Sequence, residues 1–345
     1  MDQLRSKPHV VILGAGASIA AIPNGDKNGR KTSVMKGFIK KLGMEDTIKD
    51  LNLTTTSDNL EDIYSELITI KKFEDITKDL EKRIYEYFSS LEIPDEPTVY
   101  DYLLLSLTEK DLIATFNWDP LLLQAYQRVH EITDNLPKIA FLHGNVAYGN
   151  CKNKHEKPIG GFIYNACPDC GEFFQPSKLL YPIVNKDYMR DRNLKANWIL
   201  TQQYINNAFM ITIFGYSAPK TDKAAMDLLQ KAWGKNSDRS LEEINIIDIT
   251  KVRILKNAWD KFLYFDHFNI VNNFFDSYLG SFPRRSCETV FDTLFKNQPR
   301  DNSRGFKKNW SFNKLKKFVA PLILEEEKYD RENLPNPYKE KWQDQ

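Results

Sequence analysis

Two apolar runs of the chain end in polar side chains that could do acid–base chemistry. Thr115, Asn117 and Asp119 stand at the end of the first run, and His143 stands at the end of the second. If both runs are buried parallel strands, their carboxyl ends meet at one edge of a sheet, where ligands bind. A histidine there can take a proton near neutral pH. We therefore expect a ligand site, against the alternative of an Asx turn, a helix cap and a hydrogen-bonded strand-end histidine with separate structural roles.

The stretch from His9 to Ser18, HVVILGAGAS, places two glycines directly after an apolar run. Gly14 and Gly16 would let the backbone approach a phosphate closely, with the N–H groups of a following helix directed at it. A dehydrogenase fingerprint would continue with a third glycine at position 19, where this chain has Ile19. The turn therefore predicts nucleotide binding without hydride transfer. A structural tight turn is one alternative, and a secretory signal is another, disfavoured because glycines and a serine interrupt the apolar stretch.

Three of the four cysteines are clustered in sequence. Cys151, Cys167 and Cys170 match three positions of a zinc ribbon built from two C-x2-C pairs, and Tyr148 stands where the first cysteine would be. His155 can complete a Cys3His set, because imidazole and thiolate are both ordinary zinc ligands. The sequence predicts a structural zinc site, with a metal-free remnant that holds reduced thiols as the alternative.

The overall composition suits a protein that binds a small ligand. Among 345 residues, 48 Lys and Arg nearly cancel 47 Asp and Glu, so neither nucleic acid nor an anionic membrane is expected as the main partner. No apolar run approaches the roughly eighteen residues of a membrane-spanning helix. With few cysteines we expect no disulfide framework and a cytoplasmic location, and the isolated Cys287 should be a buried small hydrophobe.

The candidate site must be positioned by strands and helices that alternate along the chain. Continuous apolar runs, typical of strands covered on both faces, predict strands at residues 10–13, 112–116, 139–142, 209–214 and 244–249. We expect a helix with Asp119 as N-cap and Pro120 in its first position, and another helix capped by Thr221 or Asp222. This repetition of strand, turn and helix predicts a doubly wound, Rossmann-like α/β fold with a parallel sheet.

Two insertions interrupt this pattern. The first, residues 30–110, has helical apolar spacing at 33–42, 59–70, 75–91 and 98–107, and the second, residues 148–198, is a small module that holds the cysteines. We expect one domain over residues 1–255 that carries both insertions. Residues 256–345 should form a mainly helical extension, whose polar tail from residue 300 is solvated or docked on a partner.

Taken in chain order, these motifs resemble the sirtuin family, and most closely its bacterial sirtuin-like branch. The resemblance implies an NAD-binding Rossmann-like domain with a small inserted module. The matching pieces are GAGAS at 14–18, AIP at 21–23, TFNWD at 115–119, LHG at 142–144, CPDCG at 167–171, FGYSAP at 214–219 with TD at 221–222, and a last strand that ends near Asp248.

The resemblance also implies roles for the residues of the site. His143 would be the general base or would orient a ribose, Asn117 would hold the nicotinamide ribose and a water, and Asp119 would lie near the carboxamide. Ala15, Gly16 and Ser18 would hold the NAD phosphates, and Gly215 and Ser217 would line the adenosine side. The other implied cofactor-binding positions are Gly14, Thr115 and Asp248.

One departure from the deacylating sirtuins bears on the activity. Where those enzymes carry a Phe-Gly-Glu signature beside the acyl-lysine channel, this chain has LLYPIVNK at residues 179–186. The resemblance to the bacterial branch therefore implies an NAD+ hydrolase that releases nicotinamide and ADP-ribose as a regulated effector of antiviral defence. It would act as a homo-oligomer or with a companion defence protein. An NAD-dependent protein deacylase and a non-catalytic NAD or ADP-ribose sensor are the alternatives.

Overall fold

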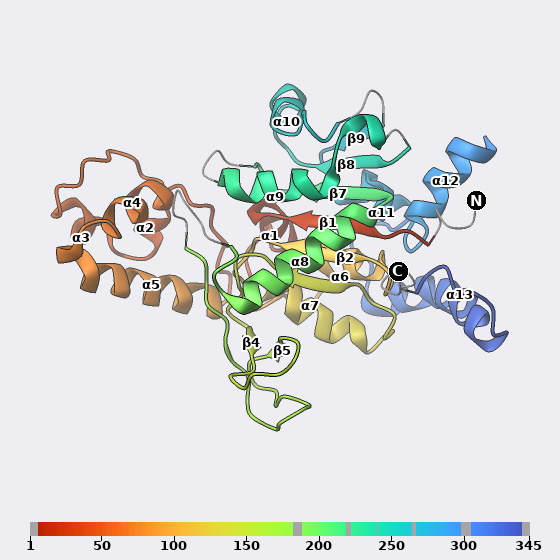
Figure 1. Cartoon of the computed structure of the whole chain (residues 1–345), viewed down its shortest axis with the longest axis horizontal. Helices are drawn as coiled ribbons and strands as arrows, with labels where there is room; N and C mark the ends of the chain where they lie inside the picture. The colour runs from red at the N-terminus through yellow and green to blue at the C-terminus, as the bar shows by residue number, and fades with distance from the viewer. Residues whose placement is uncertain are drawn as a thin grey trace.

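A computed structural model describes residues 6–181, 188–218, 222–239, 241–263, 267–297 and 305–339. Its centre is a six-stranded parallel sheet in the order β3-β2-β1-β7-β8-β9 (Figure 1). The chain starts in the middle, builds outward to one edge, and then returns to build the other half, which is the order of a doubly wound Rossmann-like sheet. The strands are β1 (His9–Leu13), β2 (Leu112–Thr115), β3 (Lys138–Phe141), β7 (Met210–Phe214), β8 (Glu243–Ile247) and β9 (Phe268–Val271). The predicted fold class and the five predicted strands are thereby confirmed.

The strands are continuously apolar because both faces of the sheet are covered. Along β1, Val10 and Ile12 join one hydrophobic cluster while Val11 and Leu13 join another, and all four are fully buried. The first cluster is covered by α8 (Arg192–Asn207), α9 (Lys223–Trp233) and α10 (Val252–Ala258). The second is covered by α1 (Ala15–Ala21), α6 (Val99–Leu105) and α7 (Leu121–His130).

The first insertion is a helical module that projects from one end of the sheet (Figure 1). It contains α2 (Phe38–Lys41), α3 (Glu45–Lys49), α4 (Leu60–Leu67), the short 3-10 helix η2 (Lys71–Phe73) and α5 (Glu74–Ser89). The helices expected over 59–70, 75–91 and 98–107 are present as α4, α5 and α6. The helix expected over 33–42 begins only at Phe38, because Gly37 turns the backbone into the left-handed region just before it.

The second insertion folds as a separate small sheet. Its strands β4 (Tyr148–Asn150), β5 (Gly160–Phe162) and β6 (Gln175–Pro176) pair antiparallel in the order β5-β4-β6. In the view of Figure 1 this module lies below the central sheet. It leads into α8, which returns the chain to β7.

The chain beyond residue 255 is mainly helical as expected, but the described part also contains a strand of the central sheet. β9 lies in this region and pairs in parallel with β8, so the sheet continues past the expected boundary. It is followed by η5 (Phe274–Asp276), α11 (Tyr278–Ser281), α12 (Ser286–Lys296) and α13 (Phe312–Arg331). The expectation of a solvated or partner-docked tail is wrong for α13, because Leu315 and Val319 are fully buried in the core of the sheet domain.

Two predicted helix caps also need correction. α7 begins at Leu121 with Pro120 as its N-cap, one position later than expected, and Asp119 Oδ1 accepts a hydrogen bond from the Leu121 N–H. Asp222 is the N-cap of α9, but its carboxylate makes no capping bond and accepts one from Tyr216 OH instead. Thr221 and residues 182–186, the last five residues of the LLYPIVNK segment, lie outside the described residues. Among the helices described, none has the length and apolar character to cross a membrane.

Candidate functional site

The turns that follow β1 and β7 at the centre of the sheet are in close backbone contact through their glycines. Gly14 N–H donates to Phe214 O at 3.0 Å, and Gly16 N–H donates to Gly215 O at 2.9 Å. A Cβ on Gly14 or Gly16 would lie 2.6 or 2.7 Å from backbone atoms of the β7 turn. Gly215 has φ +63, and a Cβ on it would in turn lie too close to backbone atoms of the β1 turn. The glycines therefore bring β1 and β7 together at the point where the winding of the sheet reverses.

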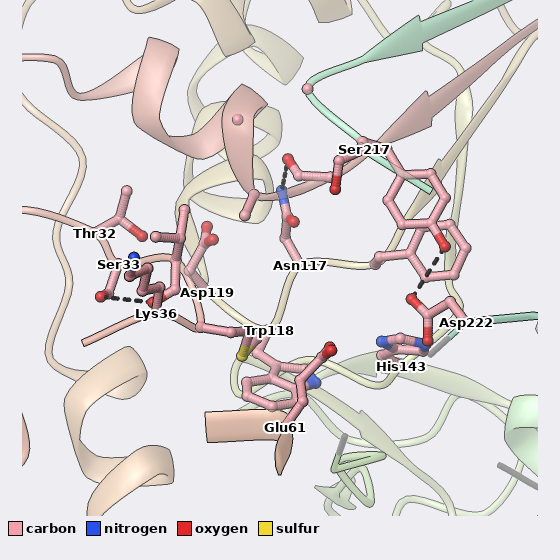
Figure 2. A pocket seen from close by; sticks show the side chains of 18 of the residues that line it. Thr32, Ser33, Lys36, Glu61, Asn117, Trp118, Asp119, His143, Ser217 and Asp222 are labelled. Atoms are coloured by element: carbon pink, nitrogen blue, oxygen red, sulfur yellow. Dashed lines mark hydrogen bonds between the residues drawn. The ribbon is translucent and has the colours of Figure 1, made fainter. Parts of the chain in front are cut away.

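A first cavity of about 410 Å³ opens beside this junction. Its lining brings together residues from the β1 turn, the β2 and β3 ends and the β7 turn, as the positions of parallel strand ends require. Figure 2 shows Asn117 between the helical-module residues on one side and His143 with Asp222 on the other. The predicted site residues among its lining are Gly14, Ala15, Gly16, Asn117, Asp119, His143, Gly215 and Ser217.

Asn117 is held firmly at the wall of this cavity. Its Nδ2 donates to Gly14 O at 2.9 Å and to Ser18 Oγ at 3.0 Å, and it reaches Tyr100 OH at 3.2 Å. The Asn117 backbone N–H in turn donates to Thr115 Oγ1 at 3.1 Å. With the amide nitrogen committed to the protein, the amide oxygen is the group of Asn117 that can serve a ligand.

Ser18 and Thr115 support the site from behind the cavity wall. Both are 1% exposed, and neither is among the lining residues. The Ser18 hydroxyl donates to Asp119 Oδ2 at 2.6 Å. Burial raises the pKa of Asp119 above its ordinary value, while the bond from Ser18 opposes that shift. Burial likewise raises the pKa of Tyr100, so its hydroxyl stays protonated beside them.

His143 lies at the far end of the cavity among aromatic side chains. It is 7% exposed, and its Nε2 is 3.1 Å from Tyr188 OH. The Phe116 ring packs edge-on against it with centroids 4.8 Å apart. Figure 2 shows Asp222 pointing toward the imidazole, and Tyr216 OH donates to the same carboxylate at 3.0 Å. A carboxylate beside an imidazole can fix the orientation of the ring.

Sequence reasoning missed several residues that line the first cavity. Asp222 was assigned only to a helix cap, although the TD motif drew attention to it. The loop from Thr32 to Lys36, together with Asn59 and Glu61, reaches the cavity from the helical module. Trp118, between the two predicted site residues, is buried with its Nε1 unpartnered among the described residues. Nothing in their local patterns distinguishes them from surface or core positions, since tertiary packing alone brings the helical module to the sheet.

A second cavity of about 830 Å³ meets the first at Gly16 and Gly215. It runs from these glycines past the end of β8, where Asp248 lies, to η5 and residues 308–309. Asp248 Oδ1 accepts a hydrogen bond from Thr250 N–H at 2.8 Å. The predicted residues of the nicotinamide side and Asp248 therefore lie in neighbouring cavities that share the glycine junction.

The four predicted metal ligands converge in the small module. One ligand atom from each of Cys151, His155, Cys167 and Cys170 lies within 4.8 Å of the others, a grouping that can hold a metal ion. A hydrogen bond from Glu172 N–H lowers the pKa of Cys170 to about 6, so its thiolate is accessible near neutral pH. The donor set of three thiolates and one imidazole suits zinc. Cys287 lies apart, buried at 3% exposure as predicted.

Comparison with known proteins finds structural neighbours only. No protein-family model matches this chain, and no curated protein matches it. Among solved structures, several Sir2 enzymes are similar to this chain. One, from a study of Sir2 mechanism and regulation, is 15% identical, with 84% of this chain and 96% of that chain covered and a TM-score of 0.40. A Sir2 complex with a p53 peptide and NAD+ is 14% identical, with 86% and 96% covered and a TM-score of 0.38. Sir2 bound to an acetylated peptide is 13% identical, with the same coverage and a TM-score of 0.36.

Proposed function

We propose that this protein is an NAD+ hydrolase that cleaves the nicotinamide glycosidic bond. The observation that carries the proposal is the pair of cavities joined at Gly16 and Gly215, with Asn117 and His143 in one and Asp248 in the other. A ligand that spans the reversal point of a doubly wound sheet is typically a dinucleotide. The first cavity would take the nicotinamide riboside half, and the second would take the adenosine half.

The lining of the first cavity suits a flat ring that carries a positive charge. Phe88, Phe116 and Trp118 contribute aromatic surface, and Glu61, Asp119 and Asp222 contribute carboxyl groups. Aromatic faces and nearby carboxylates both attract an organic cation. The nicotinamide ring of NAD+ is such a cation, and it becomes neutral when the glycosidic bond breaks. The cavity would therefore bind the substrate ring and let the neutral product leave.

The proposed reaction needs positioning and one proton transfer. The bond between ribose C1′ and the pyridinium nitrogen breaks, and its electron pair stays with nicotinamide. A water oxygen bonds to C1′, and the proton it loses goes to His143 or to solvent. The Asn117 amide oxygen would hold the water or the ribose hydroxyl, since the amide nitrogen is fixed to Gly14. Holding the reactants in this geometry can supply a large part of the rate gain in such a reaction.

The path of the chain after the small module favours water over an acylated peptide as the second substrate. Leu180 lines the first cavity, and its backbone N–H donates to His143 O at 2.9 Å. The next residue, Tyr181, stacks on Tyr64 of the helical module with centroids 5.3 Å apart and donates to Glu81 O. This bridge ties the wall of the first cavity to the helical module, on the side from which we propose that an acylated peptide would otherwise approach.

Product analysis tests the proposal. Purified protein incubated with NAD+ is expected to yield nicotinamide and ADP-ribose, and Asn117→Ala or His143→Ala should abolish turnover in a chain that stays folded. His130→Ala is the matched control, because His130 is exposed and paired with Asp134. Turnover that requires an acetyl-lysine peptide and yields acetylated ADP-ribose would identify a deacylase instead. Binding of NAD+ without turnover would identify a sensor.

We further propose that the protein works in the bacterial cytoplasm as an NAD+-depleting effector of antiviral defence. An enzyme that destroys NAD+ must be restrained in a growing cell, so we expect control by self-association or by a companion protein. Expression in cells with and without phage challenge, with NAD+ measured over time, tests the role. Unchanged NAD+ in challenged cells that contain the folded protein would count against it. Sedimentation analysis of the resting protein tests self-association.

A further inference from the structure

Part of the lining of the second cavity comes from the chain beyond residue 255, which the proposed chemistry does not otherwise use. Residues 272–275, which end in η5, and residues 308–309, which precede α13, both line this cavity. The β1 turn and the end of β8 line the same cavity. The extension is therefore part of the nucleotide site and not an appendage to it.

The segment from Gly305 to Trp310 is fixed in place by specific contacts. Phe306 N–H donates to Gly280 O at 2.8 Å, and Gly305 approaches the backbone at Gly280 and Ser281 so closely that a Cβ would lie 2.8 Å away. Tyr102 OH accepts from Trp310 N–H at 2.8 Å. Since α13 then anchors the chain in the core, residues 308 and 309 are held at the cavity on both sides.

Most of the groups expected to bind the phosphates of a nucleotide are already committed. The Gly14 and Gly16 amides donate to carbonyls of the β7 turn, and Ala17 N–H donates to Gly14 O. The Ser18 hydroxyl donates to Asp119 and lies behind the wall. A dinucleotide brings two negative charges on its diphosphate, and these need a donor or a cation from elsewhere.

Lys308 is the cation of the second cavity that remains available. Lys27, also in the lining, is paired with Asp95 at 2.7 Å. Lys308 has no ion-pair partner within the described part of the chain, and its ammonium lies 5.8 Å from the centre of the Phe275 ring. The other acids of the lining do not neutralise it. Asp26 accepts from three backbone N–H groups, of Asn28, Arg30 and Glu92. Asp248 and Glu96 make no ion pair with Lys308 in the described part of the chain.

We infer that Lys308 binds the phosphate groups of the nucleotide and that the segment 305–310 exists to place it there. This inference rests on the proposed nucleotide site, but it is separate from the proposed hydrolysis. A charge-assisted hydrogen bond to phosphate is expected to contribute at least about tenfold to affinity. Lys308 would act as a binding and specificity residue, because it distinguishes a phosphorylated ligand from a bare nucleoside.

Calorimetric binding of ADP-ribose and of adenosine tests the inference without need of turnover. Lys308→Gln should weaken ADP-ribose at least about tenfold and leave adenosine unchanged, and Lys308→Arg should stay within about threefold of the natural chain. Lys316→Gln is the matched control, since Lys316 is exposed on α13 and does not line either cavity. Added salt should reduce ADP-ribose affinity more in the natural chain than in Lys308→Gln.

Three results would overturn the inference: equal ADP-ribose affinity in Lys308→Gln and the natural chain, equal loss for adenosine and ADP-ribose, or the same loss in Lys316→Gln. The proposed hydrolysis fails separately. A chain that binds ADP-ribose through Lys308 yet leaves NAD+ intact keeps this inference and rejects the hydrolase. A chain that hydrolyses NAD+ with unchanged kinetics in Lys308→Gln does the reverse.

Discussion

The contact between the β1 and β7 turns predicts that Gly215→Ala damages both stability and the site. Gly215 has φ +63, and a Cβ there would lie 2.4 Å from Ala17 N and 2.5 Å from Gly16 Cα. The left-handed backbone alone costs an alanine about 1–2 kcal/mol. Forcing two backbones apart adds about 1–3 kcal/mol, since no flexible side chain can yield. We expect a total loss of about 2–5 kcal/mol in the free energy of unfolding.

Gly43→Ala separates the two contributions. Gly43 has φ +66, and a Cβ there would meet nothing within 4 Å, so this variant should lose only the conformational part, about 1–2 kcal/mol. Urea unfolding followed by tryptophan fluorescence gives both values on one scale. Equal losses in the two variants would refute the idea that the turns are in obligatory contact.

The same substitution should reach the chemistry. Gly14 O accepts the hydrogen bond that orients Asn117, so a displaced β1 turn moves the amide. A shift of about 1 Å in a positioning group can cost about a hundredfold in rate. We therefore expect NAD+ turnover in folded Gly215→Ala to fall by about two orders of magnitude and to stay unchanged in Gly43→Ala. Full activity in Gly215→Ala would show that the turn does not position Asn117.

Three further predictions concern the rest of the molecule. Metal analysis should find about one zinc per chain, lost in Cys167→Ser and retained in Cys287→Ala; a natural chain without zinc would contradict the site. Burial lowers the pKa of His9 to about 3, whereas the pKa in the unfolded chain is about 6.5. Below about pH 6.5 only the unfolded state binds the extra proton, so the folded state loses stability as the pH is lowered. The expected loss in the free energy of unfolding is about 2 kcal/mol between about pH 7.5 and pH 5. His9→Gln should remove that part of the slope, and an unchanged slope would mean that another group causes it. Glu326→Ala should cost about 3–5 kcal/mol in urea unfolding, because it removes the buried carboxylate that Arg284 and Arg285 share and leaves buried Arg284 without a carboxylate partner among the described residues. Glu325→Ala should cost less than about 1 kcal/mol, because Glu325 is exposed and Arg285 keeps Glu326; similar losses would contradict the buried network.

The central sheet was predictable because its strands are buried on both faces. Such strands are apolar at every position, and the pattern in residues 10–13 and 244–249 needs no knowledge of neighbours. The site residues followed from the same logic. Asn117 and His143 stand where two of these strands end, and parallel strands bring those ends to one edge of the sheet.

The C-terminal part was not predictable from local patterns. β9 is an edge strand whose four residues are all only half-buried, so FNIV lacks the strong apolar signal of the inner strands. In the acidic run from Glu325 to Glu327, Glu326 is buried because Arg284 and Arg285 meet it from about forty residues earlier in the chain. A charge run normally indicates a solvated surface, and only the tertiary structure shows which member of the run is itself buried.

The glycine turn illustrates how far a motif can be interpreted alone. GAGAS after a strand indicates that another group comes very close to the backbone, and the sequence analysis predicts that this group is a phosphate. In the structure the backbone that approaches is the β7 turn, where Gly215 supplies the matching left-handed residue. Glycines at both turns are therefore required by the reversal of the sheet whether or not a nucleotide binds. What separates a nucleotide site from a purely structural junction is the chemistry around it: an oriented amide, a histidine beside a carboxylate, and a lysine whose charge no side chain of the described chain neutralises.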